Sequence, residues 1–429
     1  MISDVETVTF APPESRFHAS VDVPGDKSLS HRALLLSAMA EGTSRVRGVA
    51  TGGDVRSMLG ALHALGVGFE KDRVVSPGIG AWLTPGQPLD LGNSGTALRF
   101  LAGALAGHPD RITLVGDASL SLRPMRRLVE PLGALGLNVQ LSSEGTAPLT
   151  TGAGNLHGVE VAIPLASAQV RTAFSVAAVQ AEGPSTVDSP GGFRDHTERW
   201  LAALGLGRWS SKTRFEILPG LVPPGSYDIP GDTSSAAFLW ASAAISPGST
   251  IRTPGVSLNP GRIGFLDILE DMGATVDRSV TRMILGDPIG DVTVIGGRLI
   301  GVHVGRVLAI RSIDELPLVA VCAGVAEGET RVIGAGELRT KETDRIAAVV
   351  GLLGDLGAEA EPTPDGFIVA GGSRYGGCRT DSRGDHRIAM AAAVAAAASE
   401  GPVTVNGFEA AAVSWPGFAE ALEAAWSSP

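Results

Sequence analysis

One pattern recurs along the chain: an apolar, helix-like stretch ends in a glycine, and a strand-like run follows it. Five copies end at Gly66, Gly136, Gly205, Gly273 and Gly357, and successive copies lie 68–84 residues apart. Glycine adopts the left-handed conformation that ends a helix before the chain turns into a strand. A last amphipathic stretch, FAEALEAAW (418–426), comes about one step later. This spacing predicts six units of about 70 residues each.

A longer repeat divides the six units into two halves. The sequence VDVPGDKSLSHRALLL (21–36) resembles YDIPGDTSSAAFLWA (227–241), and the two lie about three units apart. We therefore expect residues 21–230 to form one domain of three units. Residues 1–20 and 231–429 would form the other domain, which an N-terminal strand would complete. Each unit alternates strands with helices, and this alternation predicts the α/β fold class.

The composition excludes several classes of partner. A net charge of −11 argues against binding nucleic acid or an anionic membrane, although a local cluster of Arg and Lys can still bind small anions. The first residues lack the basic and apolar regions of a signal peptide, and the longest Ala-rich stretch (388–398) is too short to cross a bilayer. We therefore expect a cytoplasmic protein. Neither Cys322 nor Cys378 has metal-ligand spacing around it, so no metal site is expected.

Polar patches with cations occur where a strand or loop is expected to enter a helix. Several begin near candidate helix caps such as Asp26, Thr340 and Asp385. A further patch holds Gly95, whose neighbours can expose backbone N–H groups at a helix start. A cation in the first turn of a helix opposes the helix dipole, and an anionic ligand would explain it. The cations of these patches are Lys27, Arg32, Arg123, Lys341, Arg345 and Arg387.

Each patch alone has an ordinary explanation. A lone Lys or Arg near a helix start is usually a solvated surface charge, and Asp314-Glu315 could be an exposed turn. Together, in a chain of net charge −11, repeated cations at helix starts predict a cleft between the two halves that binds a pair of anionic ligands. Asp314 and Glu342, on such loops, are candidates for proton transfer.

The motifs together resemble those of a known enzyme family. PGDKSLSHR, LGNSGTALR, GDASLSLRPM, SAQVRTA, FRDHTE, RSIDELP, LRTKETDR and DHRIAM occur in the order seen in EPSP synthases, from about Val21 to Pro416. The resemblance implies a two-domain inside-out α/β barrel, in which each domain holds three βαβαββ units with buried helices and the domains close about a double crossover. It also implies transfer of the enolpyruvyl group of phosphoenolpyruvate to the 5-hydroxyl of shikimate 3-phosphate. These two small anionic substrates are then the expected partners, no metal or organic cofactor is needed, and we expect a monomer.

The same resemblance implies a role for each site residue. Asp314 would be the general base for the 5-hydroxyl, Glu342 the proton donor to the methylene carbon, and Lys27 a third catalytic residue. The expected ligands of shikimate 3-phosphate are Lys27, Ser28, Arg32, Ser167, Ala168, Gln169, Arg194, Asp314 and Lys341. The expected ligands of phosphoenolpyruvate are Lys27, Gly95, Arg123, Arg345 and Arg387.

Departures from the family pattern bear on the subclass. Arg171 follows SAQV where the second sequence class of the family usually has Lys. NPGR (259–262) replaces the usual NPTR, and the phrase VSWPGF lacks the C-terminal lysine of the first class. These departures leave the subclass and the response to the inhibitor glyphosate open.

Three alternatives are weighed against this interpretation. A UDP-N-acetylglucosamine enolpyruvyl transferase would carry a reactive Cys in its first half, whereas Cys322 and Cys378 both lie in the second half. A non-catalytic anion-binding protein would be expected to have lost Asp314, Glu342 or Lys27, and all three are present. A structural repeat protein would not need cations at helix starts.

Overall fold

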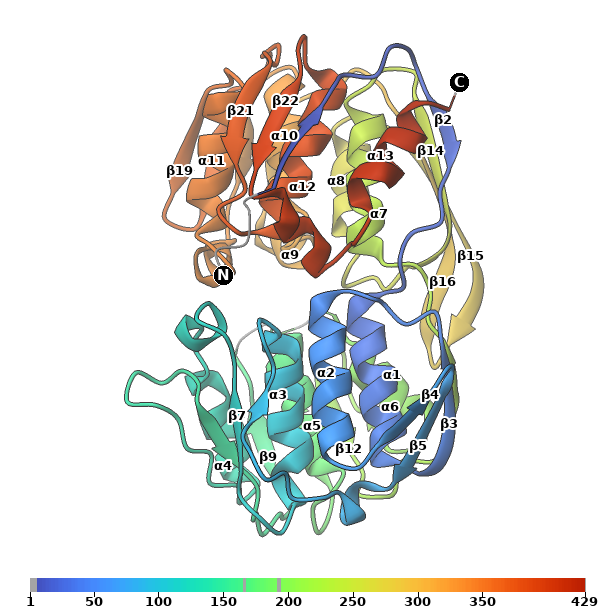
Figure 1. Ribbon diagram of the computed structural model, residues 1–429, viewed down its shortest axis with the longest axis vertical. Helices are drawn as coiled ribbons and strands as arrows, with labels where there is room; N and C mark the ends of the chain where they lie inside the picture. Colours follow the sequence, from blue (N-terminus) through green and yellow to red (C-terminus); the bar gives the residue numbers. More distant parts are fainter. Residues whose placement is uncertain (1–5, 165–166, 191–193, 429) are drawn as a thin grey trace. The chain divides into compact units, whose positions relative to one another are not determined.

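The computed structural model describes residues 6–164, 167–190 and 194–428, so residues 1–5 of the expected second domain lie outside it. Within these residues the chain forms two compact units (Figure 1). Unit 1 contains the residues up to Pro24, then Pro230–Arg282 and the chain from Pro288 onward. Unit 2 contains Gly25–Ile229 and the short segment Met283–Asp287.

Unit 2 is built from short strands and buried helices. Its helices are α1 (Lys27–Met39), α2 (Gly53–Ala64), α3 (Gly95–Ala104), α4 (Val129–Ala134), α5 (Ala168–Ala178) and α6 (His196–Ala203). Its strands are β3 (Glu41–Arg47), β4 (Gly68–Glu70), β5 (Arg73–Pro77), β6 (Leu89–Asp90), β7 (Ile112–Val115), β8 (Leu149–Thr151), β9 (Glu160–Ala162), β10 (Ser185–Asp188), β11 (Gly207–Trp209), β12 (Arg214–Ile217) and β13 (Ser226–Asp228).

Unit 1 repeats the same kind of construction. Its helices are α7 (Thr233–Ala244), α8 (Gly264–Asp271), α9 (Arg306–Arg311), α10 (Leu316–Val325), α11 (Arg345–Asp355), α12 (His386–Ala395) and α13 (Phe418–Trp426). Its strands are β1 (Thr7–Phe10), β2 (His18–Ser20), β14 (Thr250–Ser257), β15 (Thr275–Ile284), β16 (Asp287–Ile295), β17 (His303–Val304), β18 (Thr330–Val332), β19 (Ala360–Thr363), β20 (Gly366–Val369), β21 (Cys378–Asp381) and β22 (Val403–Asn406). The tip of the β15–β16 hairpin is the segment that belongs to unit 2.

The described residues form six small sheets, three with strands of each unit. Two runs of the chain show the βαβαββ order with all four strands in one sheet: β9-α5-β10-α6-β11-β12 in unit 2, and β17-α10-β18-α11-β19-β20, with α9 inserted, in unit 1. In both runs the first two strands are parallel and the last two pair antiparallel. The early strand β2 pairs in parallel with β14 and so contributes to a sheet of unit 1.

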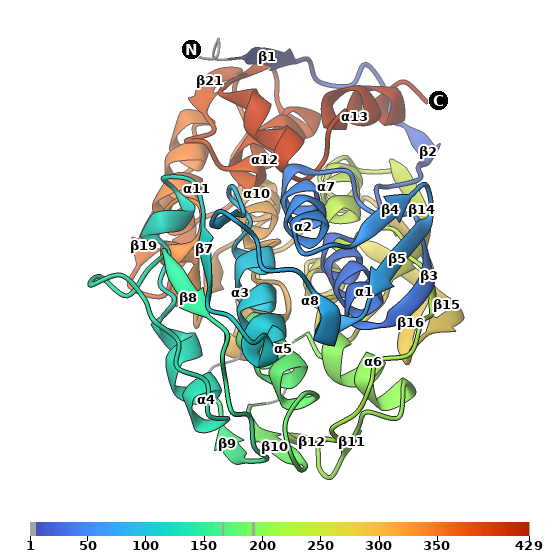
Figure 2. The ribbon, with the colours of Figure 1, turned by 60° about the horizontal axis from the view of Figure 1, so that its bottom comes forward.

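The helices lie inside and the sheets outside, as the resemblance implied, so the predicted fold class is confirmed. Every residue of α7 and of the Ala-rich α12 is buried. Small residues let such helices approach closely: a Cβ on Gly103 of α3 would overlap the carbonyl oxygen of Ala173 on α5. Figure 1 shows α1, α2 and α3 side by side in unit 2, and Figure 2 shows the sheet of β9–β12 at the edge of that unit.

The glycines of the repeat have the predicted role. Gly66, Gly136, Gly205, Gly273 and Gly357 all have positive φ, between 74° and 100°, just after α2, α4, α6, α8 and α11 respectively. The last amphipathic stretch, 418–426, is helix α13. Among the described residues, no helix is long and apolar enough to cross a membrane.

Candidate active site

In unit 2 most of the expected site residues lie at or just before the starts of four helices, whereas Arg32 lies in the second turn of α1 and Arg123 follows a 3₁₀ turn. We call Lys27, Ser28, Arg32, Gly95, Arg123, Ser167, Ala168, Gln169 and Arg194 the unit 2 cluster. Three local caps set these positions, because the side chains of Asp26, Ser94 and Ser167 accept hydrogen bonds from the first turns of α1, α3 and α5. Arg194 comes two residues before α6, and the motif residue Phe193 beside it lies outside the described residues.

Arg32 is held where three helices meet. Its guanidinium donates to Thr172 Oγ1 on α5 at 2.9 Å, to Thr197 Oγ1 on α6 at 2.8 Å and to the Ser28 carbonyl at 3.0 Å. It also lies over the ring of Phe100 on α3, 4.9 Å from the centroid. These contacts fix one cation against helices that are far apart in the sequence. Lys27, the first residue of α1, forms an ion pair with Asp54 at 2.9 Å.

A second group surrounds the start of α3. Arg99 donates to Gln169 Oε1 at 2.6 Å and to the Gly95 carbonyl at 3.3 Å, while Gln169 Nε2 donates to Thr96 Oγ1 at 2.8 Å. Arg123 donates to the side chain of Asn93. A Cβ built on Gly95 would lie 2.9 Å from Arg99 Nη1 and 3.4 Å from Arg123 Nη1. The glycine therefore lets two guanidinium groups approach the helix start.

In unit 1 the expected residues converge on one carboxylate. We call Asp314, Lys341, Glu342, Arg345 and Arg387 the unit 1 cluster. The Asp314 carboxylate is 3.5 Å from Arg345 Nη1, 3.6 Å from Arg387 Nη2 and 3.9 Å from Lys341 Nζ. Arg387 Nη1 also donates to the Asp314 carbonyl at 3.0 Å. Three cations of the unit 1 cluster thus surround one carboxylate.

Arg345 is the most enclosed member of the unit 1 cluster, with only 1% of its side chain exposed. It donates to Asp385 Oδ2 at 2.7 Å and to Glu342 Oε2 at 2.5 Å. Burial alone lowers the pKa of Arg345, but Asp385, Glu342 and Asp314 outweigh burial and leave that pKa raised. Burial raises the pKa of Asp385, yet Arg345 and His386 outweigh it and leave that pKa lowered. Both groups therefore stay charged at neutral pH.

One local expectation was wrong. The sequence suggested Thr340 as a helix cap near the cations Lys341 and Arg345. Instead Asp344 accepts hydrogen bonds from the N–H groups of Ile346 and Ala347, so α11 begins at Arg345. Lys341 lies before the helix, after a 3₁₀ turn that ends at Thr340. A carboxylate reaches two donors where the Thr340 hydroxyl bonds back to Glu337 instead.

Several residues of these clusters were missed from the sequence. Asp54, Arg99, Thr172 and Thr197 each contact an expected site residue directly. Thr172 and Thr197 lie inside the motifs SAQVRTA and FRDHTE, and Arg99 closes LGNSGTALR, so the motifs held the signal. Among the described residues, no group of three or more His, Cys, Asp or Glu side chains is arranged to hold a metal ion.

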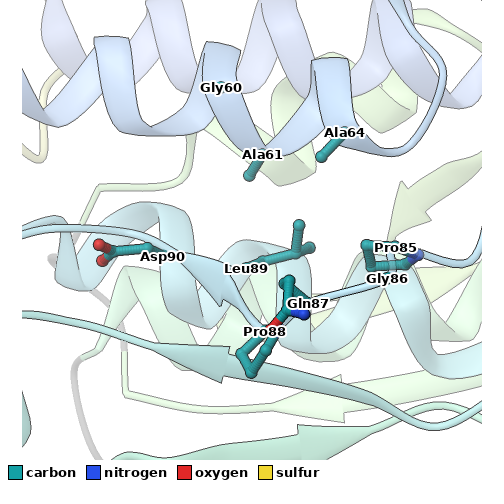
Figure 3. Close-up of a pocket in the computed structure, with 9 residues that line it drawn as sticks. All are labelled: Gly60, Ala61, Ala64, Pro85, Gly86, Gln87, Pro88, Leu89 and Asp90. Atoms are coloured by element: carbon teal, nitrogen blue, oxygen red, sulfur yellow. The ribbon is translucent and has the colours of Figure 1, made fainter.

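A pocket of about 340 Å³ lies elsewhere in unit 2, between α2 and residues 85–90. Figure 3 shows Ala61 and Ala64 pointing from α2 toward Leu89 across it. Its lining contains no cation, and its only polar side chains are those of Gln87 and Asp90. It is therefore unsuited to the anionic ligands that the sequence leads us to expect.

The comparisons with known proteins agree with this geometry. The family model of EPSP synthase (3-phosphoshikimate 1-carboxyvinyltransferase) matches residues 12–422. The chain belongs to the EPSP synthase family. The 3-phosphoshikimate 1-carboxyvinyltransferase of Herpetosiphon aurantiacus is 44% identical over 422 residues, which cover 96% of this chain and 97% of that protein.

Solved structures extend the family likeness to three dimensions. The EPSP synthase of Acinetobacter baumannii is 36% identical, with a TM-score of 0.85 over 98% of both chains. The enolpyruvyl transferase NikO from Streptomyces tendae has a TM-score of 0.78 over 98% of both chains at 17% identity, a likeness of fold alone. The likeness to a solved EPSP synthase therefore covers the helices and sheets of both units.

Proposed function

We propose that this protein transfers the enolpyruvyl group of phosphoenolpyruvate to the 5-hydroxyl of shikimate 3-phosphate, which yields 5-enolpyruvylshikimate 3-phosphate and inorganic phosphate. This is a step of the shikimate pathway toward chorismate and the aromatic amino acids. The observation that carries the proposal is the Asp314 carboxylate among Arg345, Arg387 and Lys341, in a chain whose relatives are named for this reaction.

The unit 2 cluster suits the phosphorylated acceptor. Lys27, Ser28 and Arg32 would bind shikimate 3-phosphate together with Ser167, Ala168, Gln169 and Arg194, and the helix starts add backbone N–H groups that favour anions. Gly95, Arg123 and Lys27 would bind phosphoenolpyruvate from this unit. Because Gly95 has no side chain, a ligand can approach the start of α3 closely.

The unit 1 cluster suits the remaining contacts and the proton transfers. Lys341 would contact the shikimate ring, and Arg345 and Arg387 would bind phosphoenolpyruvate. Arg345 is already bonded to carboxylates, so it would exchange its long 3.5 Å contact with Asp314 for the substrate. Arg387 is 6% exposed and donates to the Asp314 carbonyl, which orients its guanidinium. Its contacts with the carboxylates of Asp314 and Glu315 are long, 3.6 Å and 3.8 Å, so it too would exchange them for the substrate.

The reaction follows from these groups. Glu342 would donate a proton to the methylene carbon of phosphoenolpyruvate, which makes the neighbouring carbon electrophilic. The 5-hydroxyl adds to that carbon while Asp314 takes its proton, and a tetrahedral intermediate forms. Loss of a methyl proton to Glu342 and departure of phosphate, which would take up the proton held by Asp314, then restore the double bond and the starting state of both carboxyl groups. The surrounding cations would stabilise the negative charge that the intermediate carries.

The residues expected to bind each substrate belong to two different units. We propose that the acceptor and phosphoenolpyruvate draw the units together through residues of both clusters. Small-angle scattering should show a smaller radius of gyration with saturating shikimate 3-phosphate, and a smaller one again with an analogue of phosphoenolpyruvate added. An unchanged radius at saturation would argue for a preformed site.

The setting of the reaction is also part of the proposal. A net charge of −11 disfavours nucleic acid and anionic membranes as partners, and we place the enzyme in the cytoplasm as a monomer that needs only its two anionic substrates and no cofactor. The related transfer to a nucleotide sugar is disfavoured, because Cys322 is fully buried and burial raises the pKa of its thiol to about 12.

Phosphate release tests the function directly. Purified protein should release phosphate from phosphoenolpyruvate when shikimate 3-phosphate is added, without added metal ions. UDP-N-acetylglucosamine is the matched control acceptor and should give no release. Release with the nucleotide sugar and none with shikimate 3-phosphate would overturn the proposal.

A further inference from the structure

An ion pair lies next to the residues that hold Arg32. Arg171 on α5 donates from Nε to Glu198 Oε1 on α6 at 2.6 Å, and both side chains are almost completely buried. Arg171 Nη1 donates to Ser189 Oγ at 2.7 Å, and the guanidinium lies 5.8 Å from the ring centroid of Trp209. One buried guanidinium thus contacts three different segments of unit 2.

Stability alone does not explain a buried pair. Moving two charges out of water costs about as much free energy as their attraction returns, and well-packed apolar side chains often stabilise a protein as well or better. An ion pair adds a constraint on relative orientation, because a guanidinium and a carboxylate form hydrogen bonds only in a narrow range of orientations. The pair between Arg171 and Glu198 therefore restricts how α5 and α6 can shift against each other.

The residues next to the ion pair show which contacts such a restriction would maintain. The next residue on α5 is Thr172 and the preceding residue on α6 is Thr197, and their hydroxyl oxygens lie 2.6 Å apart. Both oxygens accept hydrogen bonds from Arg32. The ion pair and the hydroxyl pair that accepts from Arg32, which we call the seat of Arg32 (Thr172 and Thr197), are thus formed by consecutive residues of the same two helices.

The number of hydroxyl protons fixes the direction of each hydrogen bond between the two threonines. Each threonine hydroxyl has one proton, and that of Thr172 donates to the Ala168 carbonyl at 2.8 Å. Thr197 must then donate to Thr172, so that both oxygens present lone pairs to Arg32. A shift of α6 against α5 that broke the contact between the hydroxyls would also break the paired acceptance from Arg32.

We propose that Arg171 and Glu198 are positioning residues, which fix α5 against α6 so that Arg32 is held ready for the phosphate of the acceptor. The proposal rests on the function proposed above. It also explains the arginine at position 171: a lysine would have to bond Glu198 and Ser189 from a single nitrogen, whereas the guanidinium bonds each through a separate nitrogen in a fixed geometry.

Kinetics of paired variants test the proposal. The double variant Arg171→Met/Glu198→Leu removes both charges and should fold, because apolar side chains replace the pair. We expect its KM for shikimate 3-phosphate to rise about 10-fold or more, since misplaced binding groups lose large factors, with the KM for phosphoenolpyruvate nearly unchanged. Arg171→Lys should lie between this variant and the wild type. Arg208→Met, which breaks the exposed ion pair with Glu216 in the same unit, is the control and should change neither KM.

Two outcomes would overturn the proposal. One is a double variant with the melting temperature and the KM for shikimate 3-phosphate of the wild type. The other is structural and needs no turnover. We expect a crystal structure of the double variant to show the Thr172 and Thr197 oxygens more than about 3.5 Å apart, beyond hydrogen-bonding distance. An unchanged contact between them means that the pair does not position this seat. A wild type without turnover on shikimate 3-phosphate refutes the proposed function instead, and the crystal structure still decides the role of the pair.

Discussion

In unit 2, Arg32 donates to two threonine hydroxyls and a backbone carbonyl, whereas in unit 1, Arg345 donates to the carboxylates of Asp385, Glu342 and Asp314. Neutral oxygens orient a guanidinium and leave its charge for a ligand, but carboxylates cancel that charge. The unit 2 cluster is therefore suited to holding a phosphate. The unit 1 cluster, with its acidic groups among cations, is suited to moving protons.

The largest expected effect comes from the carboxylate at the centre of the unit 1 cluster. Asp314→Asn keeps the size of the side chain but cannot accept the 5-hydroxyl proton, so turnover should fall about 10²–10⁴-fold. Steady-state phosphate release measures it. Asp344→Asn, which keeps the cap of α11, is the control and should retain activity. Near-normal turnover of Asp314→Asn would move the base elsewhere, with Glu342 the next candidate.

A methyl group at the start of α3 tests how closely a ligand approaches unit 2. Gly95→Ala would place a carbon 3.4 Å from Arg123 Nη1. The resemblance to EPSP synthases implies that the inhibitor glyphosate binds against Gly95, in competition with phosphoenolpyruvate. The wild type should be inhibited, and Gly95→Ala should raise the inhibition constant about 10-fold or more and the KM for phosphoenolpyruvate by less. Inhibition assays at several phosphoenolpyruvate concentrations separate the two constants. Unchanged inhibition would remove Gly95 from that site.

A smaller effect is expected from one of the neutral partners of Arg32. Thr197→Val removes a hydroxyl but keeps the shape, and it leaves a guanidinium N–H without its acceptor. Since an unsatisfied buried donor costs about 1–3 kcal/mol, the KM for shikimate 3-phosphate should rise about 10-fold. Thr197→Ser restores the oxygen and should recover most of the loss. Equal KM values for the Val and Ser variants would show that the hydroxyl does not hold Arg32.

A further expected effect concerns acid stability, in which the two units should differ. His31 on α1 is fully buried, and neither ring nitrogen has a hydrogen-bond partner among the described residues. Burial lowers the pKa of His31 to about 3, whereas an unfolded histidine binds its proton near pH 6.5. Stability should therefore fall as pH drops from 6.5 toward 3, by at most about 1.4 kcal/mol per pH unit.

Hydrogen exchange can follow that difference unit by unit. Between pH 7 and 5 we expect protection to fall in α1 before it falls in α11 and α12. The lowered pKa of Asp385 in unit 1 means that its stabilising charge is lost only as pH falls below about 3.8. His31→Leu should remove the acid response of α1, and an unaltered response in that variant would assign it to another group.

Much of the fold could be predicted because its signals are local. A helix-ending glycine, a capping Asp26 or Asp385 and a first-turn cation such as Lys27 or Arg387 are each visible within a few residues, and these were placed as expected. Thr340 and Lys341 are the exception, because Asp344 caps α11 instead. The pairings between helices could not be predicted. Arg32 meets partners 140 and 165 positions away, and which side chains meet depends on how far each helix is rotated in its packing. The sequence pattern within a few residues does not determine that rotation.

The account assigns phosphate binding to unit 2 and proton transfer to unit 1. Calorimetric titration of shikimate 3-phosphate into two variants tests this division most directly. Asp314→Asn should bind it with nearly the affinity of the wild type, although turnover is lost. Arg32→Met should lose about 10-fold or more of that affinity, because a charge-assisted hydrogen bond to phosphate contributes about 1.5–3 kcal/mol. Weak binding by Asp314→Asn together with normal binding by Arg32→Met would contradict the account.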